Sequence, residues 1–431
     1  MEPAVTAILL LALLVGLILI NVPIAIAIAA VALTGILWDK GFFGLYDAAL
    51  SIFDGATSFP LIAIPLFILA GALMNTGGIS RRLIDFVSAL IGFVRGGLSM
   101  VNVGVSLFFA EISGSAVADV AAIGSVLIPA MKRKKYRPTF AAALTSSSAS
   151  LAIIIPPSIP MILYGALADT SIVQLFIAGV IPGLLGGFSM MLLCYYFAVR
   201  YDLPREEAFD LGRLGARFRE AAPALLLPLI ILGGIFGGIV TATEGAGLAV
   251  VAALVIGGLV YREINPRELH VALLEGVTQT AIVMLLVATS AVLGLYLTEA
   301  ELPQRFARGI TDISTNPIIV LMMLNVMLFL LGMILHGAAA IILVVPIVMP
   351  LVREMGIDPV QFGIILTLNI AIGQQTPPVA SVLVTSCSIA RTDIWATTRA
   401  NVPFIVLLVG LLLLVTYVPF TSLALVEAFY R

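Results

Sequence analysis

Long apolar runs separated by short polar segments dominate the chain. In the first half these runs cover about residues 4–21, 23–38, 60–76, 97–131, 138–168 and 173–199. A helix needs about 20 mostly apolar residues to cross the hydrocarbon core of a bilayer. Because lipid satisfies no backbone polar group, helices that satisfy their own are favoured there. The pattern predicts an all-α polytopic membrane protein.

Two of the apolar runs are interrupted by a pair of prolines. Pro156 and Pro157 divide the run 138–168, and Pro377 and Pro378 divide a run at about 360–390. Proline removes a backbone donor and breaks the interior of a helix. We therefore predict two broken helices, each made of two half-helices with unpaired backbone groups between them.

The prolines also indicate an internal duplication. A shift of 221 residues places five of the six prolines between positions 129 and 182 on other prolines without a gap. The matched pairs are Pro129 with Pro350, Pro138 with Pro359, Pro156 with Pro377, Pro157 with Pro378 and Pro182 with Pro403, whereas Pro160 falls on Ser381. We interpret residues 1–200 and 222–431 as two repeats joined by a charged linker, 201–221. Paired interrupted segments in two halves point to the binding site of a transporter.

The run 97–131 differs from the others because its centre is small and polar. The stretch Glu111–Asp119 reads EISGSAVAD, and the basic segment Lys132–Arg137 follows the run. It can form one full crossing or a re-entrant hairpin of two half-length helices, with a counterpart at about 316–352. The hairpin leaves five crossings per repeat. An odd number predicts that the second repeat has inverted topology.

The distribution of basic residues favours the hairpin. With five crossings per repeat, one side of the membrane receives 17 of the 22 Lys and Arg residues. The other side holds Lys40, Arg305, Arg308, Arg353 and Arg431. Basic residues concentrate on the cytoplasmic side of membrane proteins. We therefore predict a cytoplasmic linker and two periplasmic termini.

Three short segments have the spacing of amphipathic helices. They are Ile79–Ile91, Leu302–Ile313 and, more weakly, Gly41–Phe53. Such segments lie along a membrane interface or form ordinary loop helices. The first two directly precede the two hairpins, and this matched placement favours arms that connect two rigid bodies.

Composition excludes several classes of protein. The 431 residues are 61% hydrophobic and 11% charged, whereas soluble domains are about 25% charged. A net charge of −2 provides no basic surface, so we expect no nucleic-acid partner. Cys194 and Cys387 lie in apolar stretches and are predicted to be buried thiols. We find no HExxH or Walker A motif and two histidines, so we expect a transporter driven by an ion gradient, not an enzyme.

Polar side chains gather at the breaks and at the hairpin tips. A half-helix exposes N–H groups at its N-terminus and C=O groups at its C-terminus, which attract anions and cations respectively. The candidate substrate-binding residues are Ser115, Ser147, Ser148, Ser158, His336, Gln375 and Ser381. The alternative is that the hydroxyls only satisfy helix ends.

Ionisable residues inside membrane helices are functional candidates. The predicted spans contain Glu111, Asp119, Glu244 and His336. Glu244 opens a helix, so we interpret it as a capping carboxylate. Proton coupling through Glu111 or His336 stays open.

Several stretches together resemble a known family. They are SGSAVADVAAIGSVLIPAM (Ser113–Met131), IIPPSIPMILYG (Ile154–Gly165), FIAGVIPGLL (Phe176–Leu185), GIDPVQFG (Gly356–Gly363) and IGQQTPPVASVL (Ile372–Leu383). The chain resembles the large, DctM-like membrane subunit of tripartite ATP-independent periplasmic (TRAP) transporters, in the ion-transporter superfamily.

The resemblance implies sodium-driven uptake of a small organic anion of the carboxylate class across the bacterial inner membrane. It implies delivery by a periplasmic substrate-binding protein, a small four-helix membrane subunit on a separate chain, and elevator movement within the lipid bilayer. It also implies two or more sodium ions. Site 1 would use Ser113, Gly114, Ser115, Pro156 and Ser158, and site 2 would use His336, Gly337, Gly373, Gln375, Thr376 and Pro377.

Two other classes of transporter compete with this interpretation. One is a stand-alone sodium- or proton-coupled anion symporter of the same superfamily. The other is a channel, which is disfavoured because a continuous pore has no need of paired hairpins.

The charge distribution makes the orientation testable. A single cysteine in place of Lys134 should resist an impermeant thiol reagent in intact cells, because the base of the first hairpin is predicted to be cytoplasmic. Strong labelling of Lys134→Cys from outside would contradict the inverted-repeat topology.

Overall fold

The protein is helical throughout the described part of the chain. The computed structural model describes residues 9–10, 12–14, 16–18, 20, 22–113, 115–205 and 208–430. Within these ranges there is no β-strand, and nine helices are long and apolar enough to cross a membrane. The predicted all-α polytopic fold is confirmed.

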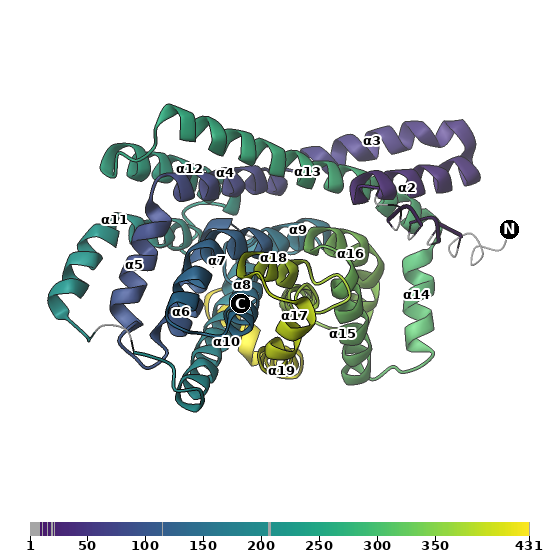
Figure 1. Ribbon diagram of the computed structural model, residues 1–431. Helices are drawn as coiled ribbons and strands as arrows, with labels where there is room; N and C mark the ends of the chain where they lie inside the picture. Colours follow the sequence, from purple (N-terminus) through teal and green to yellow (C-terminus); the bar gives the residue numbers. More distant parts are fainter. Residues whose placement is uncertain are drawn as a thin grey trace.

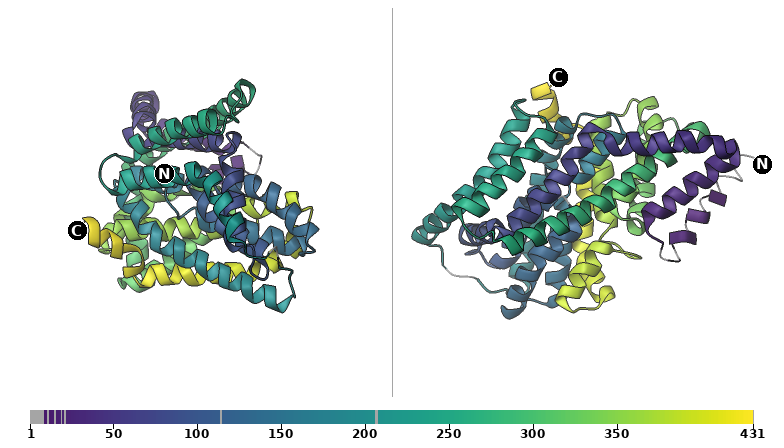
Figure 2. Two further views of the ribbon diagram at one scale, coloured as in Figure 1. Left: turned by 90° about the vertical axis from the view of Figure 1, so that its left-hand side faces the viewer. Right: turned by 90° about the horizontal axis from the view of Figure 1, so that it is seen from above.

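One group of helices forms a layer across the top of the molecule (Figure 1). It contains α2 (Ile24–Lys40), α3 (Gly44–Thr57), α4 (Ala63–Thr76), α12 (Ala242–Leu254) and α13 (Pro266–Glu299). α4 packs against α12 and α13, and α2 and α3 pack against α13. The helix α11 (Leu211–Phe236) packs on α12. We call these six helices the frame, and its long helices run across the rest of the molecule (Figure 2).

The remaining long helices form a compact group beneath the frame, which we call the body. Its first part contains α6 (Gly97–Ser113), α7 (Ala116–Arg133), α8 (Pro138–Ala152), α9 (Ile159–Leu167) and α10 (Ile172–Arg200). Its second part contains α15 (Pro317–Ile334), α16 (Gly337–Glu354), α17 (Pro359–Gly373), α18 (Ser381–Ala390), α19 (Ile394–Tyr417) and α20 (Phe420–Tyr430).

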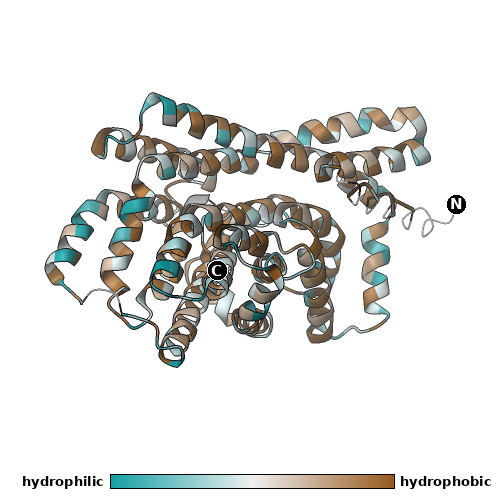
Figure 3. Ribbon diagram, viewed as in Figure 1, coloured by the Kyte–Doolittle hydropathy of each residue, from teal (hydrophilic) through white to brown (hydrophobic). Residues whose placement is uncertain are grey.

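Two shorter helices connect the frame to the body at opposite sides of the molecule (Figure 1). They are α5 (Ile79–Ile91) and α14 (Leu302–Thr311), and each directly precedes a hairpin, as predicted. Both mix polar and apolar residues, whereas the body helices are mostly hydrophobic (Figure 3). The weaker segment Gly41–Phe53 corresponds to α3, which packs on α13 within the frame.

The helix bounds repeat at the shift that matches the prolines. Adding 221 to Ala116–Arg133 gives the bounds of α16, and adding it to Pro138–Ala152 gives those of α17. The peptide bonds Pro156–Pro157 and Pro377–Pro378 are both cis. One difference is that α3 and α4 together correspond to the single long helix α13. The inversion of the two halves across a membrane stays a prediction.

Both broken helices are present, and their breaks lie at the proline pairs. α8 ends at Ala152 before α9 begins at Ile159, and α17 ends at Gly373 before α18 begins at Ser381. The predicted half-length of the hairpin helices is wrong. Each has 17 or 18 residues, which corresponds to about 26 Å.

The two halves of the chain interlock inside the body. α9 packs on α16, and α18 packs on α7, so each broken helix contacts the hairpin of the other half. At the matching contact points, Lys132 Nζ donates to the carbonyl of Ala390 at 3.0 Å and Arg353 Nη2 donates to that of Ala168 at 2.8 Å. A cation at a helix C-terminus is favourable. Lys132 and Arg353 are 221 residues apart, so the two halves make equivalent contacts.

The start of α5 is held to the frame by charge. Glu263 Oε1 lies 2.8 Å from the guanidinium groups of both Arg81 and Arg82, and Arg82 also lies 3.8 Å from the ring centroid of Tyr261. The hydrogen bond from Arg82 lowers the pKa of Glu263 below its usual value. Gly78 has φ +69°, and a Cβ there would lie 1.8 Å from Glu263 Oε2. Glycine is therefore required at this junction.

Candidate functional site

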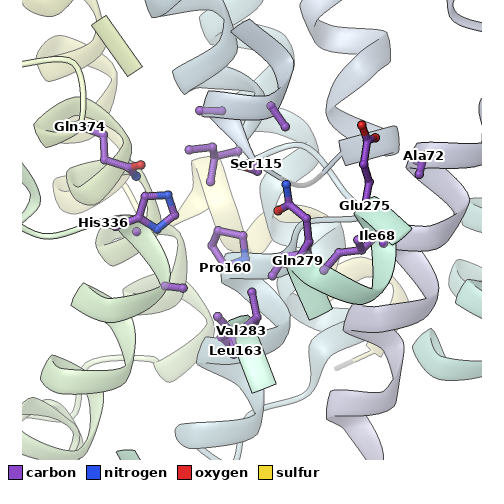
Figure 4. A pocket seen from close by; sticks show the side chains of 18 of the residues that line it. Ile68, Ala72, Ser115, Pro160, Leu163, Glu275, Gln279, Val283, His336 and Gln374 are labelled. Carbon is purple, nitrogen blue, oxygen red and sulfur yellow. The ribbon is translucent and has the colours of Figure 1, made fainter. Parts of the chain in front are cut away.

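A cavity of about 160 Å³ lies between the frame and the body. The frame contributes residues of α4 and α13, and the body contributes the N-terminal ends of α7, α9 and α16 and the residues that follow α8 and α17. Figure 4 shows His336 and Gln374 on one side of it and Ala72, Glu275 and Gln279 on the other. A pocket between two groups of helices that are joined by only a few elements is a natural place for a ligand.

Three helices begin at this cavity. Their N-cap residues are Ser115 for α7, Ser158 for α9 and His336 for α16, and none of the three side chains caps its own helix. The first residues of all three helices line the cavity, and its lining in the described part of the chain contains no Lys or Arg. Free N–H groups at helix N-termini favour an anion. The body side of the cavity therefore has the electrostatics of an anion site.

The cavity lies where the two halves of the chain meet. Three pairs of lining residues are 221 positions apart: Ser115 with His336, Ala116 with Gly337, and Ile153 with Gln374. Backbone positions are thus duplicated, but the side chains are not. Most of the polar residues that line the cavity belong to the second half of the chain.

Gln374 is a polar side chain aimed into the cavity. It is 5% exposed, and its amide makes no hydrogen bond within the described part of the chain. A Cβ at Gly337 would lie 2.9 Å from Gln374 Nε2, so the amide packs directly on the start of α16. A buried amide without a partner is costly. A bound polar ligand would satisfy it.

The frame side of the cavity holds polar residues that the sequence reasoning missed. They are Asn75 on α4, and Glu275 and Gln279 on α13. Glu275 and Gln279 are four residues apart and therefore lie on the same face of the helix. Two polar residues at this spacing in an otherwise apolar run of the sequence could have indicated that this helix face lines a polar site.

Ser147 and Gln375 lie together, but away from the cavity. The Ser147 hydroxyl is 2.6 Å from Gln375 Oε1 and 2.7 Å from Asn401 Oδ1, and Asn401 Nδ2 donates to Gln375 Oε1 at 3.0 Å. All three residues are fully buried. This cluster joins α8, the second break and α19 inside the body. The residue that faces the cavity is Gln374, one position earlier than predicted.

Ser148 also has a structural position. Its hydroxyl is 2.9 Å from Asn102 Oδ1 and 2.9 Å from Ser106 Oγ, both on α6. The residue 221 positions later, Asn369, donates to Asn325 Oδ1 on α15 at 2.7 Å. Equivalent polar contacts therefore tie each hairpin to its broken helix.

The predicted sodium ligands fall at the two breaks and the two hairpin tips. Gly114 and the side chain of Ser113 lie outside the described residues. At the first break Pro156 is buried, and the Ser158 hydroxyl is 1% exposed without a partner in the described part of the chain. The sodium role of this oxygen stays a prediction.

At the second break, the residues predicted to bind sodium have different surroundings. His336 and Gly337 line the cavity, whereas Gly373 is buried against the backbone of Gly332. The Thr376 hydroxyl donates to the carbonyl of Ile372 at 2.9 Å, so its oxygen lone pairs stay available. Pro377, in the middle of the break, and Ser381, the first residue of α18, are half-buried.

Other predicted polar residues have clear positions. Glu244 forms a capping box with Thr241 at the start of α12, as predicted. Cys194 and Cys387 are buried free thiols, also as predicted. Asp119 is buried in the first turn of α7, and the side chain of Glu111 lies outside the described residues.

Comparison with known proteins settles the family. The family model of the DctM component of tripartite ATP-independent periplasmic transporters matches residues 11–421. The chain belongs to the DctM family. It is therefore a multi-pass membrane protein of a transporter family, and the predicted resemblance is confirmed.

Curated members of the DctM family match over most of the chain. The C4-dicarboxylate TRAP transporter large permease protein DctM of Pseudomonas aeruginosa is 40% identical over 377 residues, 88% of each chain. The sialic acid TRAP transporter large permease protein SiaM of Vibrio cholerae is 36% identical over 420 residues, 96% of this chain and 97% of that protein. The isethionate TRAP transporter permease protein DctMQ of Oleidesulfovibrio alaskensis is 38% identical over 401 residues, 93% of this chain but 63% of that protein.

A solved structure supports the fold of this DctM-family chain. The crystal structure of the YdaH transporter of Alcanivorax borkumensis, a protein of unusual topology, superposes with a TM-score of 0.66. The two chains are 15% identical, and the match covers 88% of each. The likeness concerns the arrangement of helices.

The neighbouring glutamines provide a test of these positions. Gln375→Leu removes the acceptor of Ser147 and Asn401 inside the body, so we expect it to lower the free energy of unfolding by about 1–3 kcal/mol. Gln374→Leu should leave the melting temperature unchanged, because the amide makes no hydrogen bond with the described residues. It should abolish substrate uptake in proteoliposomes, because the amide faces the cavity. Melting curves and uptake assays on both variants check this, and an active, stable Gln375→Leu would contradict the assignment.

Proposed function

We propose that this chain is the large permease of a sodium-driven transporter for a small organic anion of the carboxylate class. The transporter acts in the bacterial inner membrane and receives its substrate from a periplasmic binding protein. The observation that carries the proposal is the cavity between frame and body, where three helices begin without side-chain caps.

The chemistry of the cavity supports an anionic substrate. Backbone N–H groups at the starts of α7, α9 and α16 supply partial positive charge where no Lys or Arg lines the described part of the cavity. The named relatives act on C4-dicarboxylate, sialic acid and isethionate, all of which are organic anions. A carboxylate would accept hydrogen bonds from these N–H groups and from the Gln374 amide.

Sodium coupling is supported by oxygen atoms at both breaks. A hard cation prefers carbonyl and hydroxyl oxygens. The last backbone carbonyl groups of α8 and α17 lie at the two breaks. The Thr376 hydroxyl lies 2.9 Å from the carbonyl of Ile372 near the end of α17, and the Ser158 hydroxyl at the first break has no partner among the described residues. We assign one sodium ion to each break and adjacent hairpin tip. Proton coupling through Glu111 or His336 is the alternative.

Movement of the body against the frame would carry the substrate across the membrane. The buried contacts of Ser147 with Gln375 and Asn401, and the Lys132 and Arg353 caps, hold the two halves of the body together. The chain passes between frame and body through the two arms α5 and α14 and through the segment between α10 and α11 (Figure 1). We therefore propose an elevator mechanism in which the hairpins and broken helices of two inverted repeats move together as part of one body.

Two protein partners complete the proposed transporter. The chain spans 63% of the DctMQ permease protein, which suggests a second permease component in that longer polypeptide. We expect the small four-helix subunit on a separate chain here, together with a periplasmic substrate-binding protein. A stand-alone symporter of the same superfamily is the competing candidate, and it would need neither partner.

Reconstituted uptake tests coupling and partners together. Proteoliposomes that contain this chain and its small subunit should accumulate organic anion only with a sodium gradient and a loaded binding protein. Thr376→Ala removes a candidate sodium ligand, so its apparent sodium affinity should fall about tenfold with little change in stability. Uptake driven by a proton gradient without sodium, or without a binding protein, would favour the alternatives.

Crosslinking tests the movement. Val283 on α13 and Ala338 on α16 line the cavity from the frame and the body, so a crosslink between cysteines at these sites should block uptake. Gly55 on α3 and Ala291 on α13 are neighbours within the frame and do not line the cavity, and a Cβ on Gly55 would lie close to the Cβ of Ala291. A crosslink between cysteines there should spare uptake. Undiminished transport with frame and body locked together would refute the elevator mechanism.

A further inference from the structure

The two walls of the cavity differ in charge. The body wall presents the starts of three helices, which carry partial positive charge. The frame wall presents Glu275, which is the one carboxylate among the described residues that line the cavity. The cavity is therefore polarised, with an anion-attracting side and an anion-repelling side.

The charge of Glu275 is not neutralised by the protein. Its carboxylate makes no ion pair or hydrogen bond with the described residues, whereas Glu263 pairs with Arg81 and Arg82, and Glu299 pairs with Lys40 at 2.6 Å. Glu275 also lies within the apolar segment Leu269–Glu299 that is long enough to cross a membrane. The Glu275 side chain is exposed and lines the cavity, so its charge acts on whatever the cavity holds, and an ionisable residue within such a segment is a functional candidate.

Two amides complete the frame wall. Gln279 lies one helical turn from Glu275, and its side chain makes no hydrogen bond within the described part of the chain. Asn75 Oδ1 accepts a hydrogen bond from Ser80 Oγ at 2.6 Å, which leaves its amide N–H groups for a ligand. This wall can bind hydroxyl or ammonium groups.

We propose that Glu275 determines substrate specificity by rejecting a second carboxylate on the substrate. The inference rests on the proposed function, in which the cavity binds the substrate. One carboxylate binds at the helix starts, and the opposite end of the substrate faces Glu275, Gln279 and Asn75. The preferred class is therefore a monocarboxylate with a hydroxyl or ammonium group at its far end. At an effective dielectric constant of about 20, two like charges several Å apart disfavour binding by on the order of tenfold or more.

The duplication provides a matched control. Asp54 on α3 is the residue 221 positions before Glu275, and it is an exposed acidic residue of the frame that does not line the cavity. Asp54→Asn and Glu275→Gln each remove one negative charge from equivalent positions of the two halves. A general effect of surface charge would appear in both variants, and an effect of the cavity wall would appear only in Glu275→Gln.

Protection from labelling measures binding directly. Ala72 lines the frame wall, so Ala72→Cys places a reactive thiol in the cavity, and the parent protein with buried Cys194 and Cys387 gives the background. The purified chain with its small subunit, in nanodiscs with sodium, is treated with a maleimide. The probes are succinate, 4-hydroxybutyrate and 4-aminobutyrate, which share a four-carbon length but differ in the charge of the far end.

We expect 4-hydroxybutyrate and 4-aminobutyrate to protect the thiol at concentrations about tenfold lower than succinate does. In Glu275→Gln, protection by succinate should improve about tenfold and protection by 4-aminobutyrate should weaken, with 4-hydroxybutyrate unchanged. Glu275→Ala should behave in the same way, and Asp54→Asn should match the parent.

The two possible failures are distinct. If succinate protects equally well with and without Glu275 while all probes bind, the cavity stands as the substrate site and the role of Glu275 is refuted. If no probe protects the thiol in any variant, the cavity is not the substrate site, and both the proposed function of the cavity and this inference are overturned.

Discussion

Unpaired backbone groups at the two proline breaks are the constraint on which the rest of the structure depends. Lipid cannot satisfy these groups, so the breaks must be covered by protein or line a polar cavity. Each break lies inside the body, beside the hairpins and the half-helices of both halves of the chain. The hairpins therefore shield the unpaired backbone groups of the breaks from lipid. They surround the breaks with protein while their tips bring two further helix starts to the same cavity.

The duplicated backbone and the diverged side chains have different consequences. Equivalent positions produce the paired helix starts at Ser115 and His336 and the paired caps by Lys132 and Arg353. The chemistry of the cavity comes from positions where the halves differ, such as Ile153 and Gln374. Duplication thus accounts for the geometry of the proposed anion site, and divergence of the side chains accounts for its polarity.

The distribution of polar contacts separates rigid from deformable parts of the protein. Inside the body, hydrogen bonds such as that between Asn369 and Asn325 join each hairpin to its broken helix. Between the body and the frame, the Tyr430 hydroxyl donates to the carbonyl of Phe236 at 3.1 Å, and ion pairs hold the start of the arm α5, where Glu263 pairs with Arg81 and Arg82. Directional contacts resist deformation more than apolar contacts do, which supports the proposed movement of the body against the frame.

Local patterns were enough to predict the helical membrane fold, the broken helices and the position of the hairpins, because proline chemistry and apolar length act within a few residues. The family motifs could likewise be recognised without coordinates. The roles of Gln374 and Gln375 could not be separated, because adjacent residues after a helix point in different directions that depend on the path of the break. Glu275 became part of the site only through the packing of α13 against the body, since its partners in the cavity are distant in sequence.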